Sequence, residues 1–375
     1  PVSAPIHATV SGKVIAIEPR PHPPGDMIPA IVIENDFQDT PCTDLAPLTP
    51  EQLKDPEAIL ERIREAGIVG HGGAMFPTAF KIRGGLGKVD TLIINGAECE
   101  PYCTADNRTR VEDSDHIKSG IEILKKFVQA KEYIIGIEAN KPEAISHLTE
   151  VFKDDPSVIV KTLESVYPQG AKQVLLWNAT GKVVAAGQRL ASLGVIITNV
   201  TTLAKMALYF ETGMPLIEKC VTVDGSAVKE PKNIIVPIGT SFEYCLLSCG
   251  GFKEEPRKVI EGGPMMGRTV PDLSESVVKA TNGIVAMGEK EATLSQPSAC
   301  IHCGKCVEAC PLNLNPVAFA KALNMEDEDE KEALLKREDV AQCMECGCCA
   351  FVCPAHRPLV ANNREDKRFM RSRRR

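Results

Sequence analysis

Short apolar runs and longer one-sided apolar segments alternate through the middle of the chain. The apolar runs predict strands at residues 89–94, 133–138, 158–162 and 194–200, and helices are predicted at 56–66 and 142–153. In the first helix, Ile59, Leu60 and Ile63 share one face. Strands that alternate with helices indicate a largely parallel sheet covered by helices. We therefore expect an α/β domain at residues 50–215.

The segments on either side follow a different pattern. Residues 2–34 alternate apolar and polar positions around Gly12, with a proline-rich turn expected at 19–24, and resemble half of a lipoyl-like barrel sandwich, placed at 1–40. After the α/β domain, strands are predicted at 221–223, 233–237 and 257–260, with a helix at 241–248. We expect a compact β-rich domain at 216–290. The fold class is thus multi-domain α/β.

Composition narrows the class of protein. The chain has 375 residues, 43% hydrophobic and 25% charged, with a net charge of −7. This length predicts two to four domains, and the charge argues against nucleic-acid binding. No apolar run reaches about 18 residues, so we expect no membrane span. Because the chain starts at Pro1 inside an expected strand, we expect the natural N-terminus to be missing.

Charge is concentrated near the C-terminus. An acidic segment at 324–332 leads into a helix predicted to end near Arg337, and residues 364–375 hold seven arginines or lysines. We interpret the acidic segment as solvated surface and the basic tail, 363–375, as disordered. The alternative for the tail is attraction to an anionic membrane or an acidic partner.

Eight cysteines occur in two runs of matching spacing. Each run follows C-x2-C-x2-C-x3-C-P, with which bacterial two-cluster ferredoxins hold iron–sulfur cubanes, and there the fourth cysteine ligates the other cluster. We therefore expect crossed ligand sets for two 4Fe–4S clusters. The sets are Cys300, Cys303, Cys306 and Cys353 for one cluster, and Cys343, Cys346, Cys349 and Cys310 for the other.

Zinc is the competing interpretation of four thiolates. Zinc knuckles are usually built from paired C-x2-C units. Here each run has a third and a fourth cysteine followed by a proline, and the whole pattern occurs twice, which favours iron–sulfur clusters. We predict a small helical two-cluster domain at 291–362. Cys348 is interpreted as a bystander thiol, replacing Cys349 only in another register.

A glycine-rich loop follows the first helix. Gly70, Gly72 and Gly73 precede Lys81. Glycines allow close backbone approach, so N–H groups can surround a phosphate while Lys81 supplies positive charge. The loop is neither a Walker loop nor the dinucleotide fingerprint. A structural turn without a ligand is the alternative.

The strand at 89–94 delivers polar residues to its carboxyl end, where ligands of open α/β sheets bind. Asn95 can donate to and accept from a planar ring, and Glu98 and Glu100 can hold sugar hydroxyls. Cys99 and Cys103 form a pair without a third cysteine, which indicates plain thiols rather than a metal site.

Together these motifs resemble the C subunit of the bacterial Rnf electron-transport complex, over essentially the whole chain. The similarity includes G-x-G-G-A-x-F-P-T-x-x-K at 70–81, N-G-A-E-x-E-P at 95–101, Y-P-Q-G at 167–170 and both cysteine runs. The glycine loop and acidic turn are also similar to those of the NADH-oxidising flavin subunit of respiratory complex I. The resemblance implies FMN between a site for NAD(H), the substrate, and the clusters.

The resemblance also implies roles for particular residues. The FMN phosphate would lie among Gly70, Gly72, Gly73 and Lys81, with Phe76 near flavin and nicotinamide. Asn95, Glu98 and Glu100 would line the flavin, Asn199 and Thr202 would close the pocket, and Tyr167 and Gly170 would border the nucleotide. The domain at 216–290 would be a soluble-ligand-binding β-grasp domain, which we interpret as a structural spacer.

Several positions depart from complex I. Its flavin subunit has arginine at His71, glycine at Met75, aspartate at Ala97 and an acidic pair at Ala171 and Lys172. Lys172 removes an acceptor for the nicotinamide ribose, although a lysine there is compatible with the Rnf pattern.

The expected function is a peripheral electron-transfer subunit of a membrane-bound ferredoxin:NAD oxidoreductase, exchanging hydride through FMN and single electrons through two clusters. No side chain acts as a catalytic group. Expected partners are an iron–sulfur subunit, integral membrane subunits and, indirectly, ferredoxin, at the cytoplasmic face of the cell membrane. The alternatives are a soluble NADH-dependent diaphorase subunit and a non-catalytic iron–sulfur wire with a degenerate flavin pocket at Met75 and Ala97.

Overall fold

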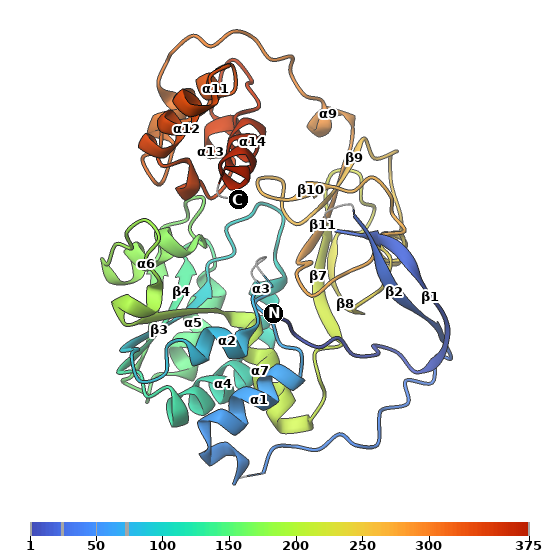
Figure 1. Cartoon of the computed structure of the whole chain (residues 1–375). Helices are drawn as coiled ribbons and strands as arrows, with labels where there is room; N and C mark the ends of the chain where they lie inside the picture. Colours follow the sequence, from blue (N-terminus) through green and yellow to red (C-terminus); the bar gives the residue numbers. More distant parts are fainter. Residues whose placement is uncertain (1, 24–25, 50, 72–74, 374–375) are drawn as a thin grey trace. The chain divides into compact units, whose positions relative to one another are not determined.

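The computed structural model describes residues 2–23, 26–49, 51–71 and 75–373 (Figure 1). The chain forms two compact units. The first contains Pro1–Gly263 and Gly267–Glu291, and the second contains Pro264–Met266 and Ala292–Arg375. The first unit holds a parallel α/β sheet, a mixed sheet and a two-stranded hairpin, and the second is helical.

The α/β sheet is four-stranded and entirely parallel, in the order β5-β4-β3-β6. Its strands are β3 (Thr91–Gly96), β4 (Glu132–Glu138), β5 (Val158–Leu163) and β6 (Val195–Asn199). The four predicted strands are confirmed, with β3 lying two residues later than expected. Because β4 and β5 extend the sheet on one side of β3 and β6 on the other, the order reverses between β3 and β6. Ligands of open sheets bind at such a point.

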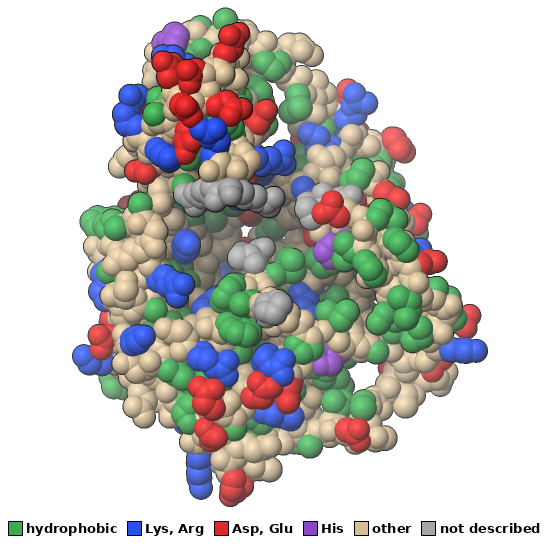
Figure 2. All heavy atoms as spheres, viewed as in Figure 1, with side chains coloured by type: hydrophobic (Ala, Val, Ile, Leu, Met, Phe, Trp, Pro, Cys, Tyr) green, Lys and Arg blue, Asp and Glu red, His purple; other side chains and the backbone are tan. Residues whose placement is uncertain are grey.

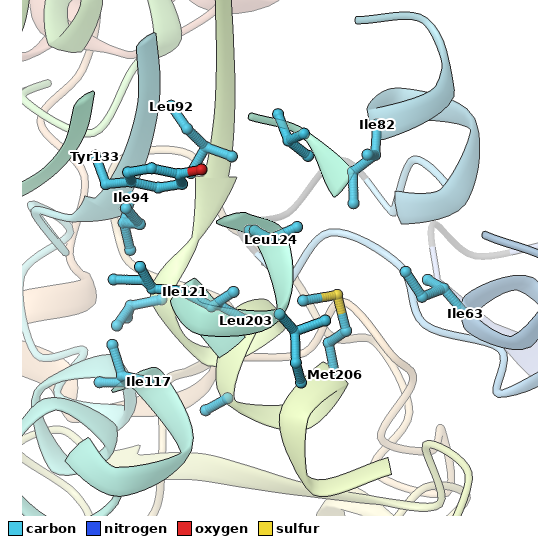
Figure 3. Close-up of a cluster of buried hydrophobic side chains, with 14 of the residues drawn as sticks. Ile63, Ile82, Leu92, Ile94, Ile117, Ile121, Leu124, Tyr133, Leu203 and Met206 are labelled. Atoms are coloured by element: carbon cyan, nitrogen blue, oxygen red, sulfur yellow. The ribbon is translucent and has the colours of Figure 1, made fainter. Parts of the chain in front are cut away.

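Alternating residues of β3 pack on opposite faces of this sheet. Leu92 and Ile94 join a large core with helices α1 (Pro56–Glu65), α4 (Ser114–Phe127) and α7 (Val200–Thr212), shown in part in Figure 3. Ile93 faces the other way and packs with α6 (Lys172–Thr180). Burying each such side chain contributes roughly 1.5–3 kcal/mol. The carboxyl ends of β3 and β6 are therefore fixed by packing on both faces.

Three further helices complete this domain: α2 (Thr78–Arg83), α3 (Ala105–Glu112) and α5 (Pro142–Val151). The predicted helices at 56–66 and 142–153 are confirmed and end one and two residues early. Each begins with proline, whose missing N–H would have no partner in the first turn. Short 3-10 helices occur at Gln52–Lys54, Leu190–Leu193 and Val340–Gln342.

The mixed sheet has the order β10-β9-β11-β7-β8. Its strands are β7 (Glu218–Asp224), β8 (Lys232–Pro237), β9 (Lys258–Glu261), β10 (Arg268–Thr269) and β11 (Gly283–Met287), with one helix, α8 (Phe242–Ser248). Cys245 and Cys249 are buried in its core. Strand β11 was not predicted, because it is a fully buried run of five residues whose apolar pattern alone does not separate strand from helix.

The N-terminal hairpin corrects one prediction. Strand β1 (Gly12–His22) runs through the expected proline turn and pairs with β2 (Asp26–Asn35), with Pro19 opposite Pro29. Proline is tolerated because both strands of a two-stranded sheet have a free edge, which needs no donor. Hydrophobic side chains, Ile17 and Ile31 among them, are exposed on this hairpin (Figure 2).

The second unit contains α10 (Lys305–Glu308), α11 (Pro316–Ala322), α12 (Glu328–Arg337), α13 (Cys348–Phe351) and α14 (Leu359–Ser372), and α9 (Glu289–Ala292) spans the boundary with the first unit. The helix predicted to end near Arg337 is confirmed as α12. In the described residues, no helix is both long and apolar enough to cross a membrane.

The expectation of a disordered basic tail is wrong for the described residues. Helix α14 covers 359–372, and Leu359, Asn363, Asp366 and Met370 are buried along one face of it. Arg373 forms ion pairs with Glu328 (3.2 Å), Glu332 (2.8 Å) and Asp329 of α12 and its first turn. The acidic segment and the basic tail thus contact each other, because one charge pattern complements the other.

Candidate functional site

The carboxyl ends of β3 and β6 bring two predicted site residues together. Asn95 and Asn199 are register partners on these neighbouring strands. Asn199 caps α7, and its Oδ1 accepts a hydrogen bond from Thr202 N at 3.1 Å. The cap fixes a helix N-terminus, which carries partial positive charge, at the edge where the sheet order reverses.

The glycine-rich loop is anchored at both described ends. Gly70 N donates to Phe76 O at 3.0 Å, and a β-bridge joins Val69 to Pro77. Gly72 and Gly73 lie outside the described residues. Met75 has a φ of 44°, in the left-handed region that glycine adopts without strain, and this explains why glycine suits the position in complex I. Met75 and Phe76 are exposed.

His71 ties this loop to α7. Its backbone N donates to Thr202 Oγ1 at 2.9 Å, and its Nδ1 lies 3.0 Å from Val69 O. A carbonyl can only accept, so Nδ1 carries the proton. Burial and the neighbouring Lys219 hold the pKa of the imidazole well below its usual value. The predicted residues Gly70 and Thr202 are thus joined through a neutral histidine.

Lys81 lies beside the glycine loop. A Cβ placed on Gly70 would be 3.7 Å from Lys81 Nζ. The side chain is half-buried and has no hydrogen-bond or ion-pair partner among the described residues. Burial lowers its pKa. A partly desolvated ammonium beside Gly70 suits an anionic group.

The acidic turn after β3 is built differently from the expectation. Glu98 is buried, and its carboxylate accepts hydrogen bonds from Asp106 N (2.6 Å) and Asn107 N (2.8 Å) at the start of α3. Arg110 Nη2 lies 3.3 Å from the same carboxylate. Burial first, and then Asp106, raise the pKa of Glu98 to about 8. Through these partners, Glu98 fixes the conformation of the turn. Direct contact of Glu98 with flavin stays a prediction.

A buried charged network next to this turn was not predicted from the sequence. Asp106 accepts from Asn199 Nδ2 at 2.6 Å and from Thr201 Oγ1 at 2.7 Å, and the fully buried Arg110 donates to Gly96 O. Glu138 ends β4 at the same sheet edge, and burial raises its pKa to about 7. Glu138 could have been selected as a candidate site residue from the sequence, because it ends a predicted strand.

The Tyr167–Gly170 turn joins the site through Asn95. Asn95 Nδ2 donates to Gly170 O at 3.0 Å, and Gly170 N donates to Cys99 Sγ at 3.3 Å. The Tyr167–Pro168 peptide bond is cis. Asn95, Cys99 and Gly170 therefore form one cluster, in which Cys99 acts as a plain thiol whose pKa burial raises to about 11.

The two cysteine runs adopt the same backbone conformation. His302 and Gly304 in the first run, and Glu345 and Gly347 in the second, have positive φ at equivalent positions. Backbone N–H groups of His302 and Leu314 donate to Cys300 Sγ (3.4 Å) and Cys310 Sγ (3.3 Å). The repeated spacing thus produces a repeated loop whose sulfurs receive hydrogen bonds.

The thiols of the two runs gather around two cavities. The first, about 470 Å³, is lined by Cys300, Cys303, Cys306 and Cys353, and the second by Cys310, Cys343, Cys346, Cys348 and Cys349. Among described residues, no three His, Cys, Asp or Glu side chains converge tightly enough for a single metal ion. The second cavity is narrow, about 20 Å³, so loading it requires its side chains to separate.

The donor sets fit the expected groups. The four expected thiols of each set line one cavity and match the ligands of a cubane, with the fourth cysteine of each run in the other run's cavity. Cys348 shares the second cavity, so it stands close enough to replace a neighbour. In the first unit, Lys81, the glycine loop and the start of α7 match the needs of a phosphate.

Family models match four segments of the chain. The Nuo51 FMN-binding domain matches residues 63–208, the SLBB domain 220–269, the RnfC barrel sandwich hybrid domain 1–38 and the 4Fe-4S dicluster domain 296–357.

Curated relatives match most of the chain. The C subunit of the Na(+)-translocating ferredoxin:NAD(+) oxidoreductase complex of Acetobacterium woodii is 42% identical over 321 residues, which cover 85% of this chain and 72% of that protein. The C subunit of the proton-translocating complex of Clostridium ljungdahlii is 43% identical, with 84% and 69% covered. The C subunit of the ion-translocating complex of Yersinia pestis is 42% identical, and the chain spans only 51% of it.

Solved structures share the fold. A chain of an NAD+-reducing NiFe-hydrogenase in the air-oxidized state aligns with a TM-score of 0.59 and 18% identity, covering 86% of this chain and 63% of that one.

The sheet edge with its glycine loop and the two thiol cavities define a flavin- and iron–sulfur-binding electron-transfer protein. The four matched models occur here in one chain. The chain belongs to the RnfC family, the C subunits of Rnf-type, ion-translocating ferredoxin:NAD(+) oxidoreductase complexes, which confirms the resemblance found in the sequence.

Proposed function

We propose that this chain is the flavin and iron–sulfur electron-transfer subunit of an Rnf-type ferredoxin:NAD oxidoreductase, exchanging hydride with NAD(H) and single electrons with other subunits. The observation that carries the proposal is the presence, in one chain, of an FMN-binding domain and an eight-cysteine dicluster domain. Bound FMN would supply the exchange between two-electron and one-electron transfer.

The residues of the first unit would bind and orient FMN. The positive charge of Lys81 and the N-terminus of α7 would hold its phosphate, beside Gly70. Asn95 and Gly170 would form the wall opposite the loop, since they are hydrogen-bonded to each other. The exposed Phe76 would border the entry for the nicotinamide. Acid–base catalysis by a side chain is not required, because hydride transfer depends on holding the nicotinamide and the flavin in the right relative position.

The proposal extends to the setting of the protein. The relatives' names describe subunits of ion-translocating complexes, so we propose further Rnf-type subunits as partners, including an iron–sulfur subunit and integral membrane subunits, with ferredoxin an indirect donor. The chain would then lie at the cytoplasmic face of the cell membrane as a peripheral subunit.

Replacing Lys81 tests the flavin site. We expect Lys81→Ala to weaken FMN binding by about tenfold or more, since a charge-assisted hydrogen bond to phosphate is lost. Binding is measured by quenching of FMN fluorescence on titration of the apoprotein. The control is Lys88→Ala, which removes an exposed lysine nearby and should leave affinity unchanged.

The wild-type chain provides the decisive measurement. Full iron content without bound flavin, together with no NADH-dependent dye reduction, would leave only a non-catalytic wire and would overturn the proposal. Co-purification with integral membrane subunits separates the Rnf setting from a soluble diaphorase subunit.

A further inference from the structure

The glycine-rich loop is held from outside the α/β domain. Asn282, which immediately precedes β11 of the mixed sheet, donates from Nδ2 to His71 O at 2.8 Å. Asn282 Oδ1 accepts from Lys219 Nζ at 2.8 Å. Lys219 lies on β7, is 1% exposed, and also donates to Lys279 O. The loop that borders the candidate phosphate site is thus connected to the mixed sheet by a series of hydrogen bonds, from His71 O through Asn282 to Lys219.

The direction of these hydrogen bonds is fixed by chemistry. An ammonium only donates, so the oxygen of Asn282 must face Lys219 and its NH₂ must face the His71 carbonyl. Lys279 adds a parallel tie, because its Nζ donates to Gly67 O at 2.6 Å. Lys279 therefore holds the segment before the glycine loop directly, through the Gly67 carbonyl, and Lys219 acts on the His71 carbonyl through Asn282.

The acidic turn is held by the same sheet. Thr104 N donates to Thr222 Oγ1 at 3.0 Å, and Thr104 Oγ1 exchanges a hydrogen bond with the amide of Asn233. Gly263 approaches Glu100 so closely that a Cβ on the glycine would lie 2.6 Å from Glu100 Cβ. Only a residue without a side chain permits this approach.

One strand pairing links the two anchor points. Thr222 N donates to Asn282 O at 3.0 Å, and β7 pairs in parallel with β11 from Thr222 and Gly283 onward. Thr222 contacts Thr104, three residues after the acidic turn, and Asn282 contacts the glycine loop, so adjacent positions of one ladder hold the segments at both loops. A spacer that only separated two domains would not need contacts at both.

We propose that the β-grasp domain is part of the flavin site. Asn282 is a positioning residue for the glycine loop, Lys219 orients Asn282, and Thr222 positions the acidic turn. This inference rests on the proposed binding of FMN between those loops. It replaces our interpretation of the domain as a spacer.

Asn282→Asp separates positioning from simple domain packing. The aspartate keeps the size of the side chain and pairs with Lys219, so the domains stay joined, but it places a carboxylate oxygen against the His71 carbonyl. We expect the FMN affinity of the full-length apoprotein to fall by about tenfold. The reason is that the hydrogen bond to His71 O is lost and a repulsive contact replaces it. The matched control is Val228→Ala, in the core of the same domain. It should lower the thermal midpoint with little change in FMN affinity.

A second measurement does not depend on FMN. The amides of Gly70 and His71 donate to Phe76 O and Thr202 Oγ1, so hydrogen exchange of the peptide that contains them reports the loop's position. In the apoprotein we expect faster exchange in Asn282→Asp than in wild type or Val228→Ala. Unchanged exchange and affinity in a folded Asn282→Asp protein, or equal losses in Val228→Ala, would overturn the inference. Wild-type protein that binds no FMN would overturn the proposed function instead, and the exchange result would still decide the positioning role.

Discussion

Asn363 shows how one side chain acts on a proposed cluster ligand. It is 1% exposed on α14, and its Nδ2 lies 3.4 Å from Cys343 Sγ, to which it donates. Hydrogen bonds to cluster sulfurs stabilise the reduced, more negative state and so raise the reduction potential. Asn363 would therefore favour electron uptake by a cluster held in the second cavity.

We expect Asn363→Leu, which retains volume but removes the donor, to lower the potential of one cluster and leave the other unchanged. An EPR-monitored redox titration of the anaerobically purified chain measures both. Asn362→Leu, one position along the same helix and only partly buried, is the control. A potential unaffected by Asn363→Leu would mean that this amide does not bond to a ligand sulfur in the loaded protein.

At the residue level, prediction from sequence reaches furthest where the determining contacts are local. The cysteine spacing places ligand positions within one loop, and the two cavities collect the eight expected thiols. The carboxylate of Glu98 contacts the start of α3, and its predicted contact with a ligand hydroxyl stays a prediction. The roles of Lys219 and Asn282 depend on contacts with residues more than 60 positions away, and no local pattern encodes these.

At the scale of elements, the strands of the parallel sheet were predictable because each contains a short apolar run and alternates with helices, whereas the equally apolar β11 was not predicted. Helix α14 was not, because two of the four residues on its buried face are Asn363 and Asp366, which hide the apolar period inside a basic sequence. Composition therefore indicated disorder. The helix forms because Met370 joins a core with Phe319 and Leu335, and because its C-terminal end complements the acidic residues of α12.

Unequal effects of substitution are therefore expected along α14. Met370→Ala should destabilise the second unit by about 2–4 kcal/mol, through lost burial and a residual cavity. Arg373→Ala should cost much less, since its ion pairs are largely solvent-exposed. Thermal loss of iron–sulfur absorption in each variant gives the comparison. If Arg373→Ala had the larger effect, charge rather than packing would hold the helix.

At the scale of the whole molecule, the proposed two-electron and one-electron chemistry is divided between the two units. The candidate flavin site lies within the first, and both thiol cavities lie within the second. The sequence anticipated this division because each unit carries its own motif. The contacts between the candidate flavin-binding loops and the β-grasp domain could not be predicted from the sequence, because they form only when the two sheets pack together.

Cys306→Ser should separate the two activities. The variant should bind FMN and be reduced by NADH as the wild type is, because residue 306 lies in the second unit, while transfer to a one-electron acceptor that depends on the clusters should be lost. Stopped-flow flavin absorbance and acceptor reduction measure the two steps. Loss of FMN binding in this variant would contradict the division.

The exchange of Cys310 and Cys353 between the cavities has a consequence for maturation. Of the eight expected ligands, each run supplies three to its own cavity and one to the other, so neither run holds a full expected set by itself. Iron–sulfur insertion must then wait until both runs have been synthesised and have folded against each other. A chain cut short between Cys310 and Cys343 would hold ten cysteines, of which four are expected ligands, but neither expected set would be complete.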